Sequence, residues 1–283
     1  MQLKVDGRQV YAATGGRTFD AGKSAIVFLH GAGMDHTVWQ LPARSFAWHG
    51  HSVLAPDLPG HGRSEGPALG SVAEMTTWVG RLLDAAGLRE AALVGHSMGG
   101  AIALEAAAGM SERITRVALL GTAAAIPVHR DLLAAARGQP DTAYRMMTSW
   151  SFGTRAKMGG NPAPGLWMTG AAMALFARNT DGLLATDLEA CNAWKTGAEA
   201  ARKLRCPTLV LLGANDIMTP TRNGRELAGL IAGSRTITIE DCGHMMQAEA
   251  PDAVLDALIA FFADAEVDQS LCSSGTSRND HSR

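Results

Sequence analysis

The sequence has few cysteines and no cysteine pattern typical of a metal site. Its 283 residues include four cysteines, none of them in a Cys-x-x-Cys pair or in a Cys/His cluster with the spacing of zinc ligands. We therefore expect reduced, unpaired cysteines and no bound metal. The four are Cys191, Cys206, Cys242 and Cys272.

Long hydrophobic runs and strong charge are also missing. No segment approaches the ~18 uninterrupted apolar residues that would span a bilayer, and the polar first residues contain no apolar run of signal-peptide length. The formal net charge is −2 and no basic stripe is visible, which argues against a nucleic-acid partner. We expect a soluble cytoplasmic protein with no membrane or nucleic-acid partner, and the sequence carries no signal for its oligomeric state.

What the sequence does have is apolar residues (47%) and 32 glycines, enough for a large core with closely packed helices. Short apolar runs alternate with helical stretches, a pattern typical of a parallel sheet covered by helices. A hairpin at 3–5 and 9–13 precedes the predicted buried strands. These strands are expected at 25–29, 52–55, 91–94, 117–120, 208–212 and 236–239.

The strand pattern stops between about 126 and 204. This segment reads as several short helices broken by proline and glycine, and it carries many methionine and tryptophan residues. We interpret it as a helical insertion in a core made of 1–125 and 205–265. The last helix should begin at Pro251 and end near position 263, and the polar residues 266–283 should form a disordered tail.

The segment Gly-His-Ser-Met-Gly at 95–99 matches the pattern Gly-x-Ser-x-Gly. A buried strand is predicted directly before it and a helix directly after it, which is the setting of a nucleophile elbow. So tight a turn leaves no room for side chains two residues before and two after the serine, and Gly95 and Gly99 meet that need. We predict that Ser97 is a nucleophile rather than an inert residue of a glycine-rich turn.

Two backbone N–H groups are predicted to bind the oxyanion that forms when Ser97 attacks a carbonyl. Met98 begins the helix after the serine, so its N–H points to where negative charge develops and the helix dipole assists. The second donor should come from the loop His-Gly-Ala-Gly at 30–33, which follows the first buried strand. We favour the N–H of Ala32 for this donor, with Gly33 as the alternative.

A serine hydroxyl needs a base, and the base needs an acidic group that holds its tautomer. Downstream of Ser97 the histidines are His129, His244 and His281. His281 lies in the expected tail and His129 opens the helical insertion, whereas His244 follows the last predicted strand. We therefore predict that His244 is the base.

The acid should follow the preceding strand. Asp216 comes just after the buried run 208–212 and before Pro220. The rival is Asp241, which lies only three residues from His244 and is too close along the chain to reach the imidazole from behind. We predict Asp216 as the acid, although an aspartate there could instead cap the following helix.

These stretches resemble the α/β-hydrolase superfamily over roughly residues 1–265. The matching motifs are HGAG at 30–33, PDLPGHGRS at 56–64, GHSMGG at 95–100, LLGANDIMTP at 211–220 and EDCGHMMQAEAP at 240–251. The resemblance implies an α/β fold with a mostly parallel eight-stranded sheet flanked by helices. It also implies a helical cap between strands six and seven, where residues 126–204 lie.

The same resemblance bears on the charged residues. Some relatives carry the acid after the sixth strand, where this chain has Gly-Thr-Ala-Ala at 121–124, and that absence strengthens Asp216. The turn that contains Asp57, His61 and Arg63 is mostly structural in the family. Relatives that dehalogenate or open epoxides use an aspartate nucleophile, so Ser97 argues against both chemistries.

Within the superfamily the chain looks similar to small-molecule ester, lactone and C–C bond hydrolases. We expect a serine hydrolase that cleaves a small, largely apolar carboxylic ester or lactone through an acyl-enzyme on Ser97, with no metal and no organic cofactor. The pocket should lie between core and cap. Its predicted substrate-binding residues are Gly31, Met34, Trp150, Trp167 and Met245.

Three alternatives use the same fold. The first is a C–C hydrolase of a vinylogous diketone acid from ring cleavage, the second a low-turnover ligand receptor, and the third cofactor-free oxygen or peroxide chemistry. The first needs a cation for the substrate carboxylate. Candidates in the insertion are Arg155, Lys157, Arg178 and Lys195.

Overall fold

The computed structural model describes residues 1–160 and 167–273, with side chains as far as position 263. Eight strands form one sheet in the order β1-β2-β4-β3-β5-β6-β7-β8. The first two pairings, β1 with β2 and β2 with β4, are antiparallel, and the other five are parallel. The predicted sheet is therefore confirmed. The strands are β1 (Gln2–Val5), β2 (Arg8–Ala13), β3 (Ala25–Leu29), β4 (Ser52–Pro56), β5 (Ala91–His96), β6 (Ile114–Leu120), β7 (Thr208–Gly213) and β8 (Arg235–Ile239).

The central strands are apolar along their whole length because both faces of the sheet are covered. Every residue of β3 is buried, and successive side chains enter different cores. Val27 and Leu29 belong to one hydrophobic cluster, whereas Ile26 and Phe28 belong to the other. A strand with only one covered face would alternate apolar and polar residues, so this continuous run itself predicts a central position.

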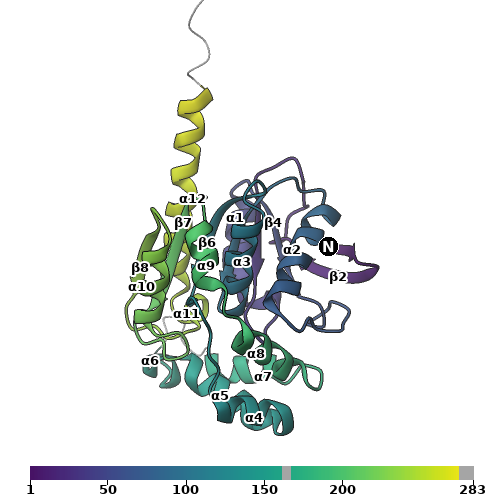
Figure 1. Cartoon of the computed structure of the whole chain (residues 1–283), viewed down its shortest axis with the longest axis vertical. Helices are drawn as coiled ribbons and strands as arrows, with labels where there is room; N and C mark the ends of the chain where they lie inside the picture. Colours follow the sequence, from purple (N-terminus) through teal and green to yellow (C-terminus); the bar gives the residue numbers. More distant parts are fainter. Residues whose placement is uncertain (161–166, 274–283) are drawn as a thin grey trace, which may run out of the picture.

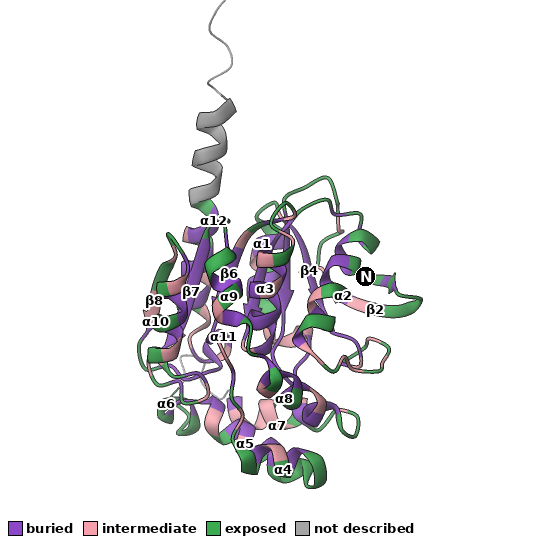
Figure 2. Ribbon diagram, viewed as in Figure 1, coloured by how far each residue is buried: buried purple, intermediate pink, exposed green. Residues whose placement is uncertain are grey.

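The helices of the core pack on the two faces of the sheet (Figures 1 and 2). One cluster contains the buried side chains of α2 and α3, and the other contains those of α1 and α12. Helix α2 begins after a capping serine, since the hydroxyl of Ser71 accepts a hydrogen bond from the N–H of Glu74 at 3.2 Å. The core helices are η1 (His36–Trp39), α1 (Gln40–Trp48), α2 (Val72–Ala85), α3 (Met98–Gly109), α9 (Gly197–Lys203), α10 (Thr221–Leu230), α11 (Met246–Glu249) and α12 (Pro251–Ser273).

Between β6 and β7 the described chain is helical. Figure 1 shows these helices gathered at the end of the molecule opposite the free end of α12. They are α4 (Arg130–Gly138), α5 (Pro140–Ser151), α6 (Thr154–Lys157), α7 (Met168–Phe176) and α8 (Leu183–Ala193). The last helix of the expected insertion, α9, instead packs on α3 and α10 and so lies with the core helices.

Two boundaries differ from the expectation. Helix α12 does not end near position 263 but continues to Ser273, because no glycine or proline interrupts the chain between Pro251 and Gly275. Of the segment 266–283 expected as a tail, 266–273 are thus helical and 274–283 lie outside the described residues. No helix in the described part of the chain is both long enough and apolar enough to cross a membrane.

Candidate active site

The turn between β5 and α3 holds Ser97 in a backbone conformation that L-residues rarely adopt, with φ 55° and ψ −117°. Strand β5 ends at His96 and α3 begins at Met98, so strand and helix meet at a single residue. An ideal Cβ on Gly95 would lie 2.2 Å from the carbonyl oxygen of Gly99. The glycine spacing is therefore a steric requirement of the turn.

Gly99 brings the first turn of α3 against the end of β3. A Cβ there would lie 2.2 Å from the carbonyl oxygen of Leu29, which is closer than any real contact. The loop that follows Leu29 is the predicted oxyanion loop, and a Cβ on Gly31 would lie 3.3 Å from Cβ of Ser97. These close approaches place the nucleophile beside that loop.

The predicted base and acid are bonded to each other. Nδ1 of His244 lies 2.8 Å from Oδ2 of Asp216, and both side chains are almost completely buried. Because a carboxylate only accepts hydrogen bonds, Nδ1 carries the proton, which leaves Nε2 free to take one from a nucleophile. The carboxylate bonded to His244 is thus that of Asp216, whereas Asp241 is exposed.

Hydrogen bonds from the turn after β7 hold the Asp216 carboxylate. The N–H groups of Met218 and Thr219 donate to Oδ1 at 2.8 and 2.9 Å, and the Thr219 hydroxyl donates to Oδ2 at 2.7 Å. Burial by itself would raise the pKa of Asp216. The charge and hydrogen bond of His244, together with the two hydrogen bonds from Thr219, outweigh burial and lower this pKa. This environment therefore favours the charged form of the Asp216 carboxylate.

The loop that carries His244 is fixed by its backbone. The N–H groups of His244 and Met245 donate to the carbonyl of Ser151, at the end of α5, at 2.8 and 3.1 Å. Nε2–H of His96 donates to the carbonyl of His244 at 2.9 Å, and burial lowers the pKa of His96 to about 3, so it stays neutral. Glu249 also holds this loop, through Gly243.

The carboxylate of Glu249 joins two glycine backbones. Oε2 accepts the N–H of Gly153 at 2.9 Å, and Oε1 accepts the N–H of Gly243 at 3.1 Å. Gly153 belongs to the insertion and Gly243 precedes His244. The helical insertion is consequently attached to the loop of the predicted base.

In the oxyanion loop the two candidate donors differ in their partners. The N–H of Gly33 donates to Oδ2 of Asp187 at 2.7 Å, so it is already used. Ala32 lines the same cavity as Ser97. Met98, as the first residue of α3, has an N–H without an acceptor inside the helix. The geometry therefore favours Ala32 and Met98 as donors over Gly33.

The cavity that contains Ser97 and Ala32 has a volume of about 280 Å³ and an apolar wall. Of the predicted pocket residues it includes Trp150, and no lysine, arginine or carboxylate is among its described lining residues. Its apolar side chains come from α4, α5, α8 and the loops after β6 and β7. They include Ile126, Leu132, Met147, Leu188, Ile217 and Met218.

The other predicted substrate-binding residues lie elsewhere. Met34 and Met245 line a second cavity, of about 200 Å³, whose described lining residues do not include Ser97. Gly31 lies behind Ser97, at the close approach described above. Trp167 is 76% exposed and is not among the described residues that line either cavity. Its position at the start of a helix of the insertion gave no sign of that exposure.

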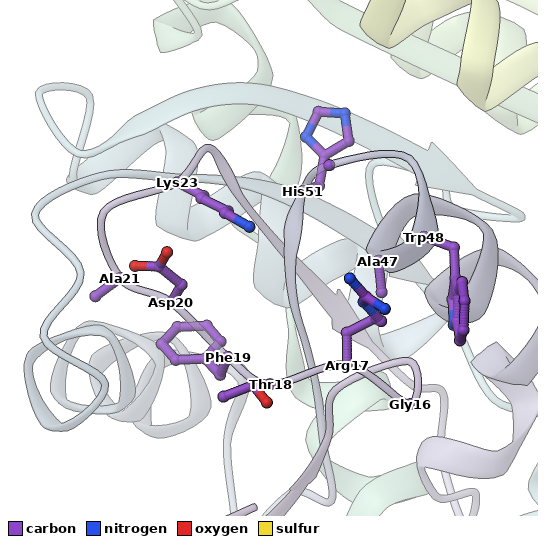
Figure 3. Close-up of a pocket in the computed structure, with 11 residues that line it drawn as sticks. Gly16, Arg17, Thr18, Phe19, Asp20, Ala21, Lys23, Ala47, Trp48 and His51 are labelled. Atoms are coloured by element: carbon purple, nitrogen blue, oxygen red, sulfur yellow. The ribbon is translucent and has the colours of Figure 1, made fainter.

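Another hollow of the molecule lies outside this cavity. This larger hollow has a volume of about 860 Å³ and lies before β3 and at the end of α1. Figure 3 shows residues that line it, among them Arg17, Lys23 and Trp48. The hollow lies at the amino ends of the strands, on the opposite edge of the sheet from Ser97. It therefore plays no part in the site.

Asp35, His36 and Asp57 bring three possible metal-ligand atoms within 4.8 Å of one another. Their polar atoms are already engaged, however: Oδ1 of Asp57 lies 2.7 Å from Nδ1 of His36, and Oδ2 accepts the N–H of Arg63. Asp35 accepts hydrogen bonds from Thr37 at the start of η1. This cluster fixes the turn, and we assign it no metal.

Sequence reasoning missed several residues that the structure brings to the site. Ile217 and Met218 directly follow Asp216, so their proximity could have been inferred from the position of the acid. Leu188 and Asp187 are in α8, where nothing in the local pattern signals a contact with the core. Such contacts depend on how the insertion folds back onto the sheet.

A family model described as the alpha/beta hydrolase fold matches residues 24–251. The chain belongs to the α/β-hydrolase fold family. It is 31% identical to the 2-hydroxymuconate semialdehyde hydrolase of Pseudomonas sp. strain CF600, over 92% of this chain and 95% of that protein. The crystal structure of the enol-lactonase from Burkholderia xenovorans LB400 covers 93% of this chain and 100% of its own, with a TM-score of 0.83 and 27% identity.

This α/β hydrolase also matches part of a longer protein. It is 39% identical over 118 residues to the dihydrolipoyllysine-residue acetyltransferase component of the acetoin cleaving system of Cupriavidus necator, 41% of this chain but only 30% of that protein. The 2-hydroxymuconate semialdehyde hydrolase and the enol-lactonase named above are both hydrolases. Family and relatives together support a hydrolase.

Replacing Gly99 by alanine should destabilise the hydrolase by about 1–3 kcal/mol and reduce its activity, because the new methyl group meets backbone that cannot move aside. The matched control is Gly109→Ala in the same helix, where a Cβ meets nothing within 4 Å. That control should be neutral or slightly stabilising. Urea unfolding of the two variants measures the difference, and equal stabilities would contradict the steric account.

Asp216→Asn should lower kcat for any substrate of this α/β hydrolase by about 10⁴-fold, because the amide would favour the wrong tautomer of His244. Asp241→Asn is the control, since Asp241 is exposed and has a φ of 53°, which asparagine tolerates. Its kcat should stay at the wild-type level. A loss in Asp241→Asn with full activity in Asp216→Asn would reverse the assignment of the acid.

Proposed function

We propose that the chain hydrolyses small, largely apolar carboxylic esters or lactones through an acyl-enzyme on Ser97. The observation that carries this proposal is that Ser97 and Ala32 share an apolar cavity of about 280 Å³. The bonded pair of His244 and Asp216 supplies the base. In this proposal residues 126–204 act as the cap over a core of 1–125 and 205–265.

The proposed reaction has two halves. His244 takes the proton of the Ser97 hydroxyl as its oxygen attacks the carbonyl carbon, and the N–H groups of Ala32 and Met98 bind the oxyanion. His244 then protonates the leaving alcohol oxygen as the bond between that oxygen and the carbonyl carbon breaks. Water, deprotonated by His244, then attacks the acyl carbon, and His244 returns the proton to the Ser97 oxygen as the acyl–serine bond breaks. Each lost oxyanion donor should cost about 3–4 kcal/mol of transition-state stabilisation.

The second candidate is hydrolysis of a C–C bond in a ring-cleavage product, which the likeness to a 2-hydroxymuconate semialdehyde hydrolase favours. Such a substrate carries a carboxylate. None of Arg155, Lys157, Arg178 and Lys195 is among the described lining residues of either cavity, and Arg178 instead lies 3.5 Å from Asp35. For this reason we place neutral esters and lactones first.

Ser97→Ala should abolish hydrolysis of a short p-nitrophenyl ester, with kcat reduced by about 10⁶-fold, because no other group takes the acyl transfer step. Ser111→Ala, at an exposed position, is the matched control and should hydrolyse the ester normally. The measurement is release of p-nitrophenol. Hydrolysis by Ser97→Ala at the wild-type rate would refute the proposal. A single stoichiometric burst of p-nitrophenol from the wild-type protein, without further turnover, would favour the receptor alternative.

A substrate panel separates the two reactions. Neutral short-chain esters and small lactones should have a kcat/KM at least about 10-fold above that of a ring-fission dienoate, because a carboxylate in this cavity would lose hydration without gaining a cation. The comparison is made on the wild-type enzyme with purified substrates. A preference for the dienoate would establish C–C hydrolysis instead.

A further inference from the structure

Asp187 is a buried carboxylate of α8 that reaches the core. Its side chain is completely inaccessible, and its Oδ2 atom has two partners from segments far away in the sequence. One is the N–H of Gly33, at 2.7 Å, in the oxyanion loop. The other is Nε2 of His61, at 2.8 Å, in the turn after β4. A charge removed from water in this way needs a compensating positive charge.

His61 provides that charge, as its two ring contacts show. Nε2 faces the Asp187 carboxylate, and Nδ1 lies 3.0 Å from the carbonyl oxygen of Pro59. Both partners are acceptors only, so both ring nitrogens carry hydrogen and the ring is an imidazolium. Burial would lower the pKa of His61, but the charge and hydrogen bond of Asp187 outweigh it and raise the pKa.

The other titratable groups around the pair do not replace this charge. The ring of His30 lies 4.9 Å from that of His61, and burial lowers the pKa of His30 to about 4. His30 is neutral, since its Nε2 accepts the N–H of Leu58 and its Nδ1 donates to the carbonyl of Gly31. On α8, burial raises the pKa of the Cys191 thiol, which is also neutral. Asp57 adds a second negative charge near His61.

The oxyanion loop is held on both sides of Ala32, and Asp187 holds one of these sides. Gly33 has a φ of 67°, its N–H is held by Asp187, and its carbonyl accepts a hydrogen bond from Nδ2 of Asn179 at 3.0 Å. On the other side the carbonyl of Gly31 is held by His30 at 2.9 Å. The peptide N–H of Ala32 therefore lies between two anchored units, and one of the anchors comes from the insertion.

We propose that Asp187 and His61 form a positioning pair through which the helical insertion sets the oxyanion loop, so that the Ala32 N–H points to the developing oxyanion only while the pair is intact. This inference rests on the proposed function, because it assigns Ala32 as an oxyanion donor. Neither side chain is among the described lining residues of the cavity that contains Ser97. Their effect is on the transition state, where an oxyanion donor contributes most.

The test is the rate at which a fluorophosphonate labels Ser97, because the phosphoryl oxygen needs the same donors and no natural substrate is required. Asp187→Asn should slow labelling about 10-fold or more, a part of the ~100-fold that follows loss of a whole donor. His61→Gln should slow it similarly, and the double variant should be no slower than either single variant, since the two residues act as a unit. The matched control is Asp181→Asn, an exposed aspartate before α8, with the wild-type rate.

Kinetics on a short p-nitrophenyl ester distinguish positioning from general disruption. kcat should fall by the same factor as labelling while KM stays within about twofold, because ground-state binding depends on the cavity rather than on the oxyanion donors. His61→Gln provides a second route if Asp187→Asn folds poorly, which thermal unfolding would reveal. Labelling and kcat at wild-type levels in a folded variant of either residue would overturn the pair.

The pH dependence gives an independent readout. The pKa of His61 is raised above its ordinary value of 6.5, so the charged pair is complete below that pH and is lost as the pH rises through the raised pKa. Wild-type labelling should therefore decline on the alkaline side, and His61→Gln should lack this decline. An identical alkaline profile in both would contradict the inference. If Ser97 of the wild type is not labelled at all, the proposed function fails, and the inference fails with it.

Discussion

The contact between the first turn of α3 and the end of β3 is the constraint on which the rest of the site depends. It brings Gly99 against the carbonyl of Leu29 and forces Ser97 into a strained conformation at the junction of strand and helix. Since parallel strands end at the same edge, the loops after β3, β7 and β8 converge around that serine. The strain persists because two buried cores hold strand and helix in place from both faces of the sheet.

The insertion between β6 and β7 is hydrogen-bonded to the two loops that carry His244 and Ala32. Ser151 accepts the backbone N–H groups of His244 and Met245, and Glu249 joins Gly153 to Gly243. On the other side of Ser97, Asp187 holds the oxyanion loop. Both loops that flank the nucleophile thus take part of their position from the insertion. A shift of α5 would therefore displace the loop of His244, and a shift of α8 would displace the loop of Ala32.

The sheet follows from the sequence because local patterning sets it, and local patterns also predict the nucleophile turn and the acid. Continuous apolar runs predict central strands, the spacing of Gly95 and Gly99 predicts the turn, and Asp216 lies in the loop after a buried strand. The contacts of the insertion do not follow from such patterns. Asp187 meets Gly33 across 154 positions of the chain, and Trp167 turns out to be exposed, because tertiary packing decides which face of a short helix is covered. Helix α12 similarly passes its expected end, since no breaking residue stops it.

His30, His61, His96 and His244 are all buried, and their hydrogen-bond partners explain why they differ in charge. His30 and His96 bond to backbone, and burial keeps both neutral. His61 has a carboxylate on Nε2 and a carbonyl on Nδ1, so it holds a second proton and its charge serves structure. His244 has a carboxylate on Nδ1 alone, which leaves Nε2 available for proton transfer. A second carboxylate or carbonyl acceptor at that nitrogen would hold a proton there and remove the base. The same pair of residue types can therefore anchor a loop or support catalysis, depending on whether the second ring nitrogen is occupied.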